Sequence, residues 1–178
     1  MAMNNILLST AAQQIWDFLC RHPQEAFFSA EVANRTLLSN GGVNQILRTM
    51  TQQGLLQTEK KGRMIFYRVY SKSPLIKQFK ILRSVTLAEE LIKKIKLFAE
   101  KIILFGSCAR GEDTPESDFD IFVVSREKDK IGKLVIPQKE GRKVQWIIKT
   151  PQEFIVLGKK EPVFYEEIQR GIILWEKE

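Results

Sequence analysis

Residues 102–124 read IILFGSCARGEDTPESDFDIFVV and contain two apolar runs separated by a polar loop. The first run is short and continuous, as expected of a buried strand. Gly106 permits a sharp turn, and Ser107 is placed to cap a short helix through Cys108–Arg110. The free amides at the start of such a helix, together with the Ser107 hydroxyl and the Arg110 cation, predict an anion site.

The second apolar run follows the loop Gly111–Ser117 and begins with Asp118, Phe119 and Asp120. Because strand side chains alternate, the two carboxylates are expected on one face, about 6.5–7 Å apart along the strand, with Phe119 on the other. Neighbouring carboxylates repel each other unless a cation lies between them. Hard oxygen ligands suit Mg²⁺, or Mn²⁺, which shares its coordination with substrate phosphates. A phosphate pocket facing an acidic metal site is what nucleotidyl transfer requires.

This segment resembles the signature of the DNA polymerase β-like nucleotidyltransferase superfamily, and in particular its minimal nucleotidyltransferase (MNT) branch. The signature is Gly-Ser, ten residues, then Asp-x-Asp, and it falls on Gly106, Ser107, Asp118 and Asp120. The flanking GSxxRG and SDxD extensions match as well. The run at 162–175, PVFYEEIQRGIILW, looks like the last helix and closing strand of these domains. The resemblance spans about residues 97–175.

The resemblance implies an α/β domain with a mixed sheet over residues 101–178. It implies that Gly106, Ser107 and Arg110 bind the phosphates of a nucleoside triphosphate, with ATP as the first candidate. It also implies that Asp118 and Asp120 are catalytic and bind the metal. Such a site moves a nucleoside monophosphate to an acceptor hydroxyl. MNT relatives that act as antitoxins modify a partner protein, so a toxin–antitoxin-like protein acceptor is one option beside nucleic acids and small molecules.

The match departs from the family at the third carboxylate that active members carry on a later strand. The candidate strand is Lys143–Lys149, KVQWIIK, and the acidic position falls on Gln145. A neutral amide replaces neither an anionic ligand nor a proton acceptor near neutral pH. Glu140 and Glu153 are nearby in sequence, but neither lies within that strand. The alternative is therefore a non-enzymatic transcriptional regulator whose degenerate domain binds nucleotide or mediates dimerisation.

The net charge of +7 is distributed unevenly along the chain. Residues 1–80 hold ten Lys and Arg against four Asp and Glu, giving +6, and residues 81–178 hold eighteen against seventeen, giving +1. The basic half is the candidate for binding a polyanion such as nucleic acid. The imbalance predicts two modules with different partners.

The basic half shows the periodicity of three short helices followed by a hairpin. The helices are expected at Thr10–Arg21, Ala30–Arg35 (capped by Ser29) and Val43–Gln53, with a chain break at Ser39–Gly42 and a stop at Gly54. The strands are expected at Leu55–Thr58 and Met64–Tyr70, on either side of a basic turn at Lys60–Arg63. The third helix presents short polar and guanidinium groups that can reach base edges or phosphates.

This order resembles a winged helix-turn-helix domain of transcriptional regulators, over roughly Ser9–Tyr70, within a predicted domain 1–72. The resemblance implies binding to double-stranded DNA through the third helix and the basic turn, which would be the wing. The side chains expected at the DNA are Asn44, Gln45, Arg48, Thr49, Lys60, Lys61 and Arg63. The alternative is a helical protein-interaction domain.

Residues 73–100 are expected to connect the two domains as one or two helices that begin at Ser73-Pro74. The segment links and covers the two cores, or forms the seam of a homodimer. The overall expectation is an α+β protein. Two cysteines and one histidine cannot build a four-ligand zinc site or a disulfide scaffold. Met1–Leu8 lacks the features of a secretion signal, and no apolar run is long enough for a membrane span, so a cytoplasmic location is expected.

Overall fold

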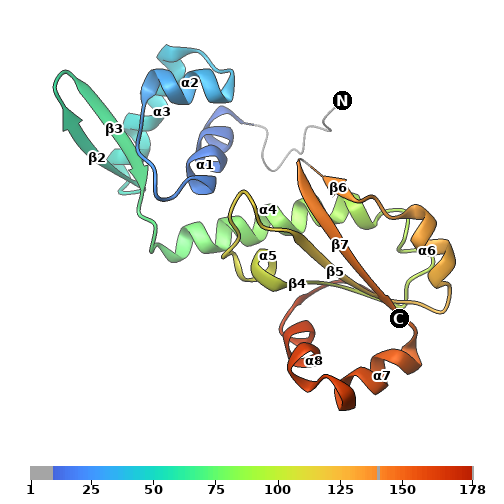
Figure 1. Ribbon diagram of the computed structural model, residues 1–178. Coiled ribbons are helices and arrows are strands. Elements are labelled where there is room, and N and C mark those ends of the chain that lie inside the picture. Colours follow the sequence, from blue (N-terminus) through green and yellow to red (C-terminus); the bar gives the residue numbers. More distant parts are fainter. Residues whose placement is uncertain (1–9, 140, 178) are drawn as a thin grey trace. The chain divides into compact units, whose positions relative to one another are not determined.

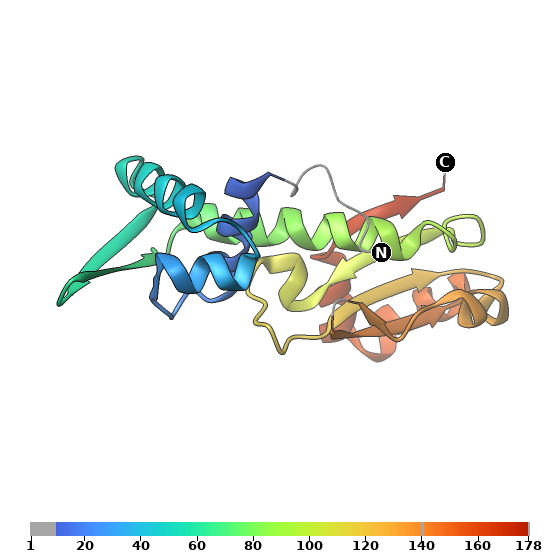
Figure 2. The same cartoon turned by 90° about the horizontal axis from the view of Figure 1, so that it is seen from above.

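The computed structural model describes residues 10–139 and 141–177. The chain divides into two compact units, residues 1–76 and residues 77–178, and the division falls inside one helix (Figures 1 and 2). Among the described residues, no helix combines the length and the apolar character that crossing a membrane requires.

The first unit combines three helices with a small antiparallel sheet. In chain order the elements are α1 (Ala11–Arg21), β1 (Phe27–Phe28), α2 (Ser29–Thr36), α3 (Asn40–Gln52), β2 (Leu56–Lys61) and β3 (Met64–Val69). The strand order is β1-β3-β2, and β2 and β3 form a hairpin (Figure 1). The core is built from one side of each helix, with Ile15, Leu19, Val32, Val43 and Leu47 almost fully buried.

Two local predictions in this unit were wrong at their ends. Ser39 does not lie in a break: it caps α3, its hydroxyl accepting a hydrogen bond from the Gly42 amide at 3.4 Å. The two glycines therefore form the first turn of the helix, where their missing side chains cost little. Ser29 is the first residue of α2 rather than its cap. The predicted stop at Gly54 is confirmed by its φ of 74°.

The second unit is a five-stranded mixed sheet with helices on both faces. Its elements are α4 (Pro74–Ile92), β4 (Lys101–Phe105), α5 (Gly106–Arg110), β5 (Phe119–Val124), α6 (Lys128–Leu134), β6 (Gln138–Lys139), β7 (Arg142–Lys149), α7 (Pro151–Lys160), α8 (Pro162–Gln169) and β8 (Ile172–Glu176). The strand order is β6-β7-β5-β4-β8. Among the strands that the structure describes in this sheet, only the β5–β7 pair is parallel. The α4 helix runs unbroken to Ile92 and ends earlier than the predicted connecting helix.

Alternation along β5 distributes its side chains between two cores. Phe119, Ile121 and Val123 pack with residues of α4 on one face of the sheet. Phe122 and Val124 pack on the other face with residues of α7 and α8, which Figure 1 draws together below the sheet. Since the sheet is covered on both faces, the polar groups of the motif gather where β4 ends and β5 begins.

Candidate functional site

The turn after β4 is made by Gly106, whose φ of 70° lies in the left-handed region that favours glycine. Because the turn is completed there, α5 starts at Gly106 and Phe105 occupies the N-cap position. The prediction that Ser107 caps the helix is therefore wrong: Ser107 is its second residue, and its carbonyl accepts the Glu112 amide at 3.0 Å. The helix has only five residues, so its dipole adds little to an anion site.

Asp120 brings the two halves of the motif together. It pairs with Phe105 across β4 and β5, one residue before the turn. A Cβ atom built on Gly106 would lie 2.5 Å from Asp120 Oδ2, closer than real contacts allow. The Asp120 carboxylate therefore lies directly against Gly106, in the space that the Cβ atom of any other residue type would occupy.

The surroundings of Asp120 disfavour its negative charge. Burial, the charge of Asp118 and then the charge of Glu167 raise the pKa of Asp120 above its ordinary value, while Arg110 acts in the opposite direction. Asp118 directly precedes β5, and its carbonyl accepts a hydrogen bond from the Cys108 thiol at 3.4 Å. Asp120 thus lies in the field of two other acids, and a cation bound beside it would relieve that repulsion.

Oxygen ligands from Asp118 and Asp120 suit Mg²⁺ or Mn²⁺ by their chemistry. In the described part of the chain, no cluster of three or more His, Cys, Asp or Glu side chains has a geometry that could hold a metal ion. Two carboxylates alone would leave the remaining coordination positions to water and to phosphate oxygens, which is how Mg²⁺ is commonly held.

The strand beside Asp120 carries the residue that departs from the family. In the parallel β5–β7 pair, Asp120 is in register with Gln145, which is exposed. Glu153 lies outside the strand in α7, where it accepts bonds from the Thr150 amide at 2.6 Å and from Lys128. Glu140 lies outside the described residues. The register therefore puts a neutral amide next to the acid.

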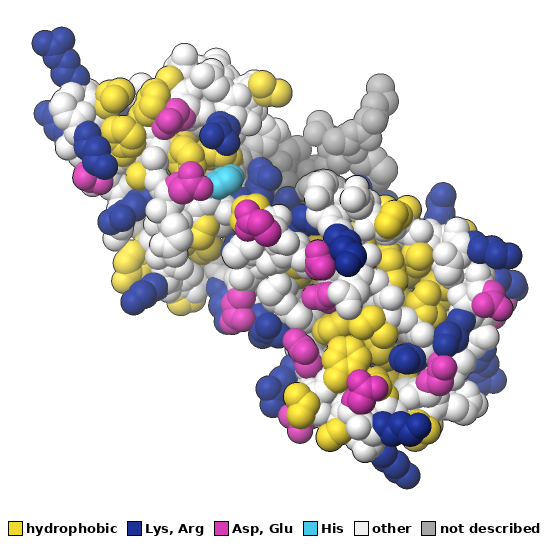
Figure 3. Space-filling model, in the orientation of Figure 1, with side chains coloured by type: hydrophobic (Ala, Val, Ile, Leu, Met, Phe, Trp, Pro, Cys, Tyr) yellow, Lys and Arg dark blue, Asp and Glu magenta, His cyan; other side chains and the backbone are white. Residues whose placement is uncertain are grey.

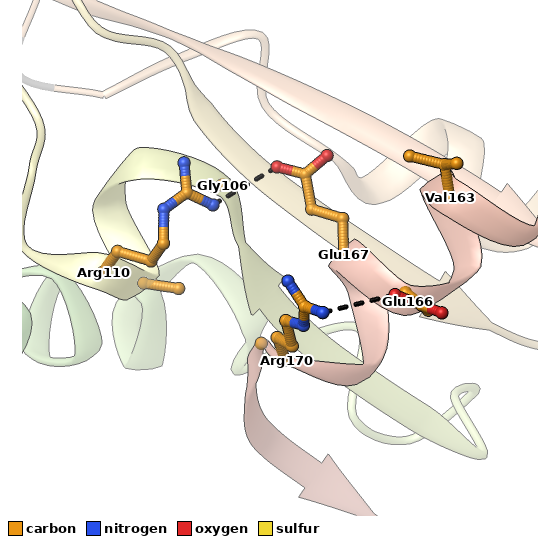
Figure 4. A pocket seen from close by; sticks show the side chains of 8 residues that line it. Gly106, Arg110, Val163, Glu166, Glu167 and Arg170 are labelled. Atoms are coloured by element: carbon orange, nitrogen blue, oxygen red, sulfur yellow. Dashed lines mark hydrogen bonds and ion pairs between the residues drawn. The ribbon is translucent and has the colours of Figure 1, made fainter.

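A cavity of about 330 Å³ lies between α5 and α8 (Figure 4). Gly106 and Arg110 line it from α5, and Glu166, Glu167 and Arg170 from α8 and its end. Arg110 Nη1 lies 3.3 Å from Glu167 Oε1, and Arg170 Nη2 lies 3.2 Å from Glu166 Oε2. The α8 residues were not predicted as part of a site; the Glu–Arg spacing of four residues was the only local signal.

A buried ion-pair network holds the loop that connects α5 to β5. Arg142 Nη2 lies 2.8 Å from Asp113 Oδ2 and donates to the Thr114 carbonyl at 3.0 Å. Lys80 donates to the Asp113 carbonyl, and its Nζ lies 3.8 Å from Asp113 Oδ1. Arg142 Nη1 also lies 3.8 Å from the Cys108 sulfur. These contacts tie the loop to β7, to α4 and to α5, and no local sequence pattern indicates them.

The residues predicted at DNA lie on α3 and on the β2–β3 hairpin of the first unit. Gln45, Arg48 and Thr49 are exposed on α3, and Asn44 is half-buried. Figure 3 shows Lys and Arg side chains at the free end of the hairpin, drawn at the upper left. Lys60, Lys61 and Arg63 are exposed there. Unlike the predicted four-residue turn, the hairpin turns at two residues, because Lys60 and Lys61 still pair within β2.

Within the second unit, the chain is similar in sequence to a known family. The sequence model of the family described as "Nucleotidyltransferase domain" matches residues 86–173. No curated protein sequence matches the chain.

Two solved structures are similar over part of their length. A mutant of ZitR from Lactococcus lactis is 17% identical with a TM-score of 0.37, and the match covers 46% of this chain and 60% of ZitR. An inferred nucleotidyltransferase from Sulfolobus solfataricus is 19% identical with a TM-score of 0.38, and the match covers 55% of this chain and 85% of that protein. The match to the nucleotidyltransferase family model spans residues 86–173, which include the glycine turn and both acids of the motif.

Proposed function

We propose that this protein transfers a nucleoside monophosphate from a nucleoside triphosphate, ATP, to an acceptor hydroxyl in a Mg²⁺-dependent reaction. The observation that carries the proposal is the carboxylate of Asp120 lying directly against Gly106 inside the matched domain. An acidic metal site and a phosphate-binding turn must adjoin for this chemistry, because a divalent ion held by the carboxylates would neutralise charge on phosphates bound at the turn.

Each residue of the site has a distinct role in the proposed reaction. The backbone at Gly106 and Ser107 and the guanidinium of Arg110 would bind phosphate oxygens and orient the α-phosphorus. Asp118 and Asp120 would hold Mg²⁺ or Mn²⁺, which when bound neutralises charge on the phosphates. The acceptor oxygen forms a bond to the α-phosphorus, and the bond from that phosphorus to the bridging oxygen of the β-phosphate breaks. Pyrophosphate leaves, and the hydroxyl proton passes to solvent water.

The proposal is tested with α-labelled ATP, Mg²⁺ and a lysate that supplies protein, nucleic-acid and small-molecule acceptors. Label transfer that requires the metal and disappears in the Asp118→Asn, Asp120→Asn double variant supports the enzyme. The Asp129→Asn variant is the control, because it removes a carboxylate from the exposed surface of α6. Metal-dependent transfer that survives in the double variant would contradict the proposed roles. A labelled protein would favour a toxin–antitoxin-like pair.

We further propose that the first unit is a winged helix that binds double-stranded DNA, with α3 as the recognition helix and the hairpin as the wing. Its support is the exposure of Arg48 together with the basic hairpin end, in a half of the chain with a charge of +6. Affinity for duplex DNA is expected to fall steeply with salt and to weaken when Arg48, or the hairpin cations, are replaced by Ala. Arg21→Ala, on α1, removes the same charge elsewhere and serves as the control.

A second function is favoured by one observation, the register of Gln145 with Asp120. Without an acid at that position the domain would bind ATP but transfer nothing, and the protein would be a transcriptional regulator that senses nucleotide or dimerises. Binding without label transfer, over a range of lysates, would support this function. Gln145→Asp would then be expected to tighten Mn²⁺ binding, because it adds a third oxygen ligand.

A further inference from the structure

Arg110 is held by carboxylates from two different parts of the unit. Its Nε lies 2.9 Å from Glu112 Oε2, just after α5, and its Nη1 lies 3.3 Å from Glu167 Oε1 on α8. Glu112 has a second cation, because Lys77 Nζ donates to its other oxygen at 3.0 Å. The charge of Glu112 is therefore shared with Lys77, and Glu167 is the acid that depends on Arg110.

Glu167 stands at the proposed phosphate site. It lines the same cavity as Gly106, and Figure 4 shows its side chain directed at that of Arg110. Its negative charge also reaches Asp120, whose pKa it raises. The carboxylate of Glu167 thus pairs with the Arg110 guanidinium that a phosphate would bind, close to the proposed metal ligands.

We propose that Glu167 sets the affinity of the nucleotide site and its preference for metal-bound over metal-free nucleotide. The inference rests on the proposed function, and it adds a residue that the sequence motif does not contain. In the absence of nucleotide, the carboxylate of Glu167 takes the place of a phosphate oxygen on Arg110. A triphosphate must displace it, and it then binds beside the displaced negative charge.

Displacement is inexpensive because both partners are partly in solvent, with Arg110 47% and Glu167 44% exposed. Exposed pairs of this kind contribute little, and guanidinium groups bind phosphate strongly. Repulsion is the larger effect. A triphosphate without a divalent ion meets Asp118, Asp120 and Glu167 together, whereas a bound Mg²⁺ offsets much of that charge. Glu167 therefore favours the metal-bound nucleotide over the free one.

Calorimetric titration of the 178-residue chain with ATP, in Mg²⁺ and in EDTA, tests the inference. Glu167→Gln is expected to tighten binding about two- to fivefold with Mg²⁺, since the competing charge on Arg110 is gone. In EDTA the tightening is expected to exceed about tenfold, because like charges no longer oppose the free triphosphate. The ratio of the two affinities would thus move toward one, which a purely structural role of Glu167 would not produce.

Glu166→Gln is the matched control, because it removes the same charge from the adjacent residue of α8. Glu166 pairs with Arg170 rather than Arg110, and both partners are more than two-thirds exposed, so a smaller change is expected. Equal effects of the two substitutions, or weaker binding by Glu167→Gln, overturn the inference while leaving the proposed function intact. Absence of ATP binding by all three proteins overturns the proposed function, and the inference with it.

Discussion

Two arginine–carboxylate pairs in the second unit resemble each other in chemistry and differ in their exposure to solvent. Arg142 and Asp113 are 2.8 Å apart, with side chains 7% and 4% exposed. Arg110 and Glu167 are 3.3 Å apart, with side chains 47% and 44% exposed. A buried ion that loses its partner is left uncompensated in a medium of low dielectric, whereas an exposed ion is hydrated by water. The first pair therefore maintains the fold, and the second is available to a ligand.

The buried pair acts on the site through the polypeptide chain. Arg142 belongs to β7, and Asp113 to the loop that leads from the glycine turn to Asp118. The same guanidinium contacts the Cys108 sulfur, and the Cys108 thiol donates to the carbonyl of Asp118. The pair thereby fixes the loop between the two halves of the motif, and the exposed pair borders the cavity that the motif faces.

The largest expected effect is that of Asp113→Ala. The substitution leaves Arg142 buried without its counter-ion, and Lys80 loses a neighbour as well. The free energy of unfolding is expected to fall by about 3–5 kcal/mol, measured by urea denaturation at pH 7.

The double variant Asp113→Ala, Arg142→Met is the control for this comparison. Removing both charges avoids the uncompensated guanidinium, and Lys80 keeps its bond to the backbone carbonyl of residue 113. A hydrophobic replacement of a buried pair is often neutral or better. The double variant is therefore expected to recover most of the lost stability. If Asp113→Ala alone cost less than about 1 kcal/mol, the pair would behave like a surface pair and the contrast would be lost.

A second prediction uses Cys108, which lies in the same buried region. Burial, and then the charge of Asp113, raise the pKa of this thiol from its ordinary 9.0 to about 11, and Arg142 only partly opposes them. Between these values the unfolded chain releases a proton that the folded chain keeps, so stability present at lower pH is lost as the pH rises from 9 to 11. The loss attributable to Cys108 is expected to be about 2 kcal/mol.

The measurement compares wild type with Cys108→Ala in urea denaturation at several pH values. Every other titratable group is common to both proteins, so the difference between the two curves isolates the thiol. The difference in the free energy of unfolding between wild type and Cys108→Ala is expected to shrink steadily above pH 9. Parallel curves would show that the thiol ionises as freely in the folded chain as in water, and the low dielectric assigned to this side of the loop would be wrong.

A third prediction concerns the glycine turn after β4. Gly106→Ala forces a residue with a side chain into a φ of 70° and drives its Cβ into Asp120 Oδ2. The strain is expected to cost about 1–2 kcal/mol, and the displaced carboxylate to weaken ATP binding in Mg²⁺. Gly132→Ala in α6 is the control, because nothing lies within 4 Å of its added Cβ. If Gly106→Ala bound nucleotide as tightly as wild type, Asp120 would not take part in the phosphate pocket.

The sequence predicted the central part of the domain because that part is encoded locally. The apolar runs that became β4 and β5 lie on either side of Gly106 and Asp120, so strands and motif could be read together. The closing helix and strand at 162–175 also agree with α8 and β8. The α7 helix was missed although a local signal existed, since Thr150 and Glu153 form a capping box around Pro151.

The remaining features depend on contacts between residues far apart in the chain. Asp113 is 29 residues from Arg142, and Arg110 is 57 residues from Glu167, so no periodicity or spacing joins either pair. The position of Gln145 beside Asp120 was a different case, because the family pattern pointed to that strand and the parallel register agrees. Local pattern thus found the residues of the motif, and only the fold revealed the charges that surround it.

The smallest expected effect is that of Glu167→Gln on stability. Arg110 keeps Glu112 as a partner and remains in contact with water, so the free energy of unfolding is expected to change by less than about 1 kcal/mol. The same urea experiment, with Glu166→Gln beside it, provides the measurement. A loss comparable to that of Asp113→Ala would mean that the pair fastens α8 to α5. A triphosphate could then reach Arg110 only by separating those helices. The Arg110–Glu167 pair would in that case maintain the fold as the Arg142–Asp113 pair does, and the contrast between the two pairs would be lost.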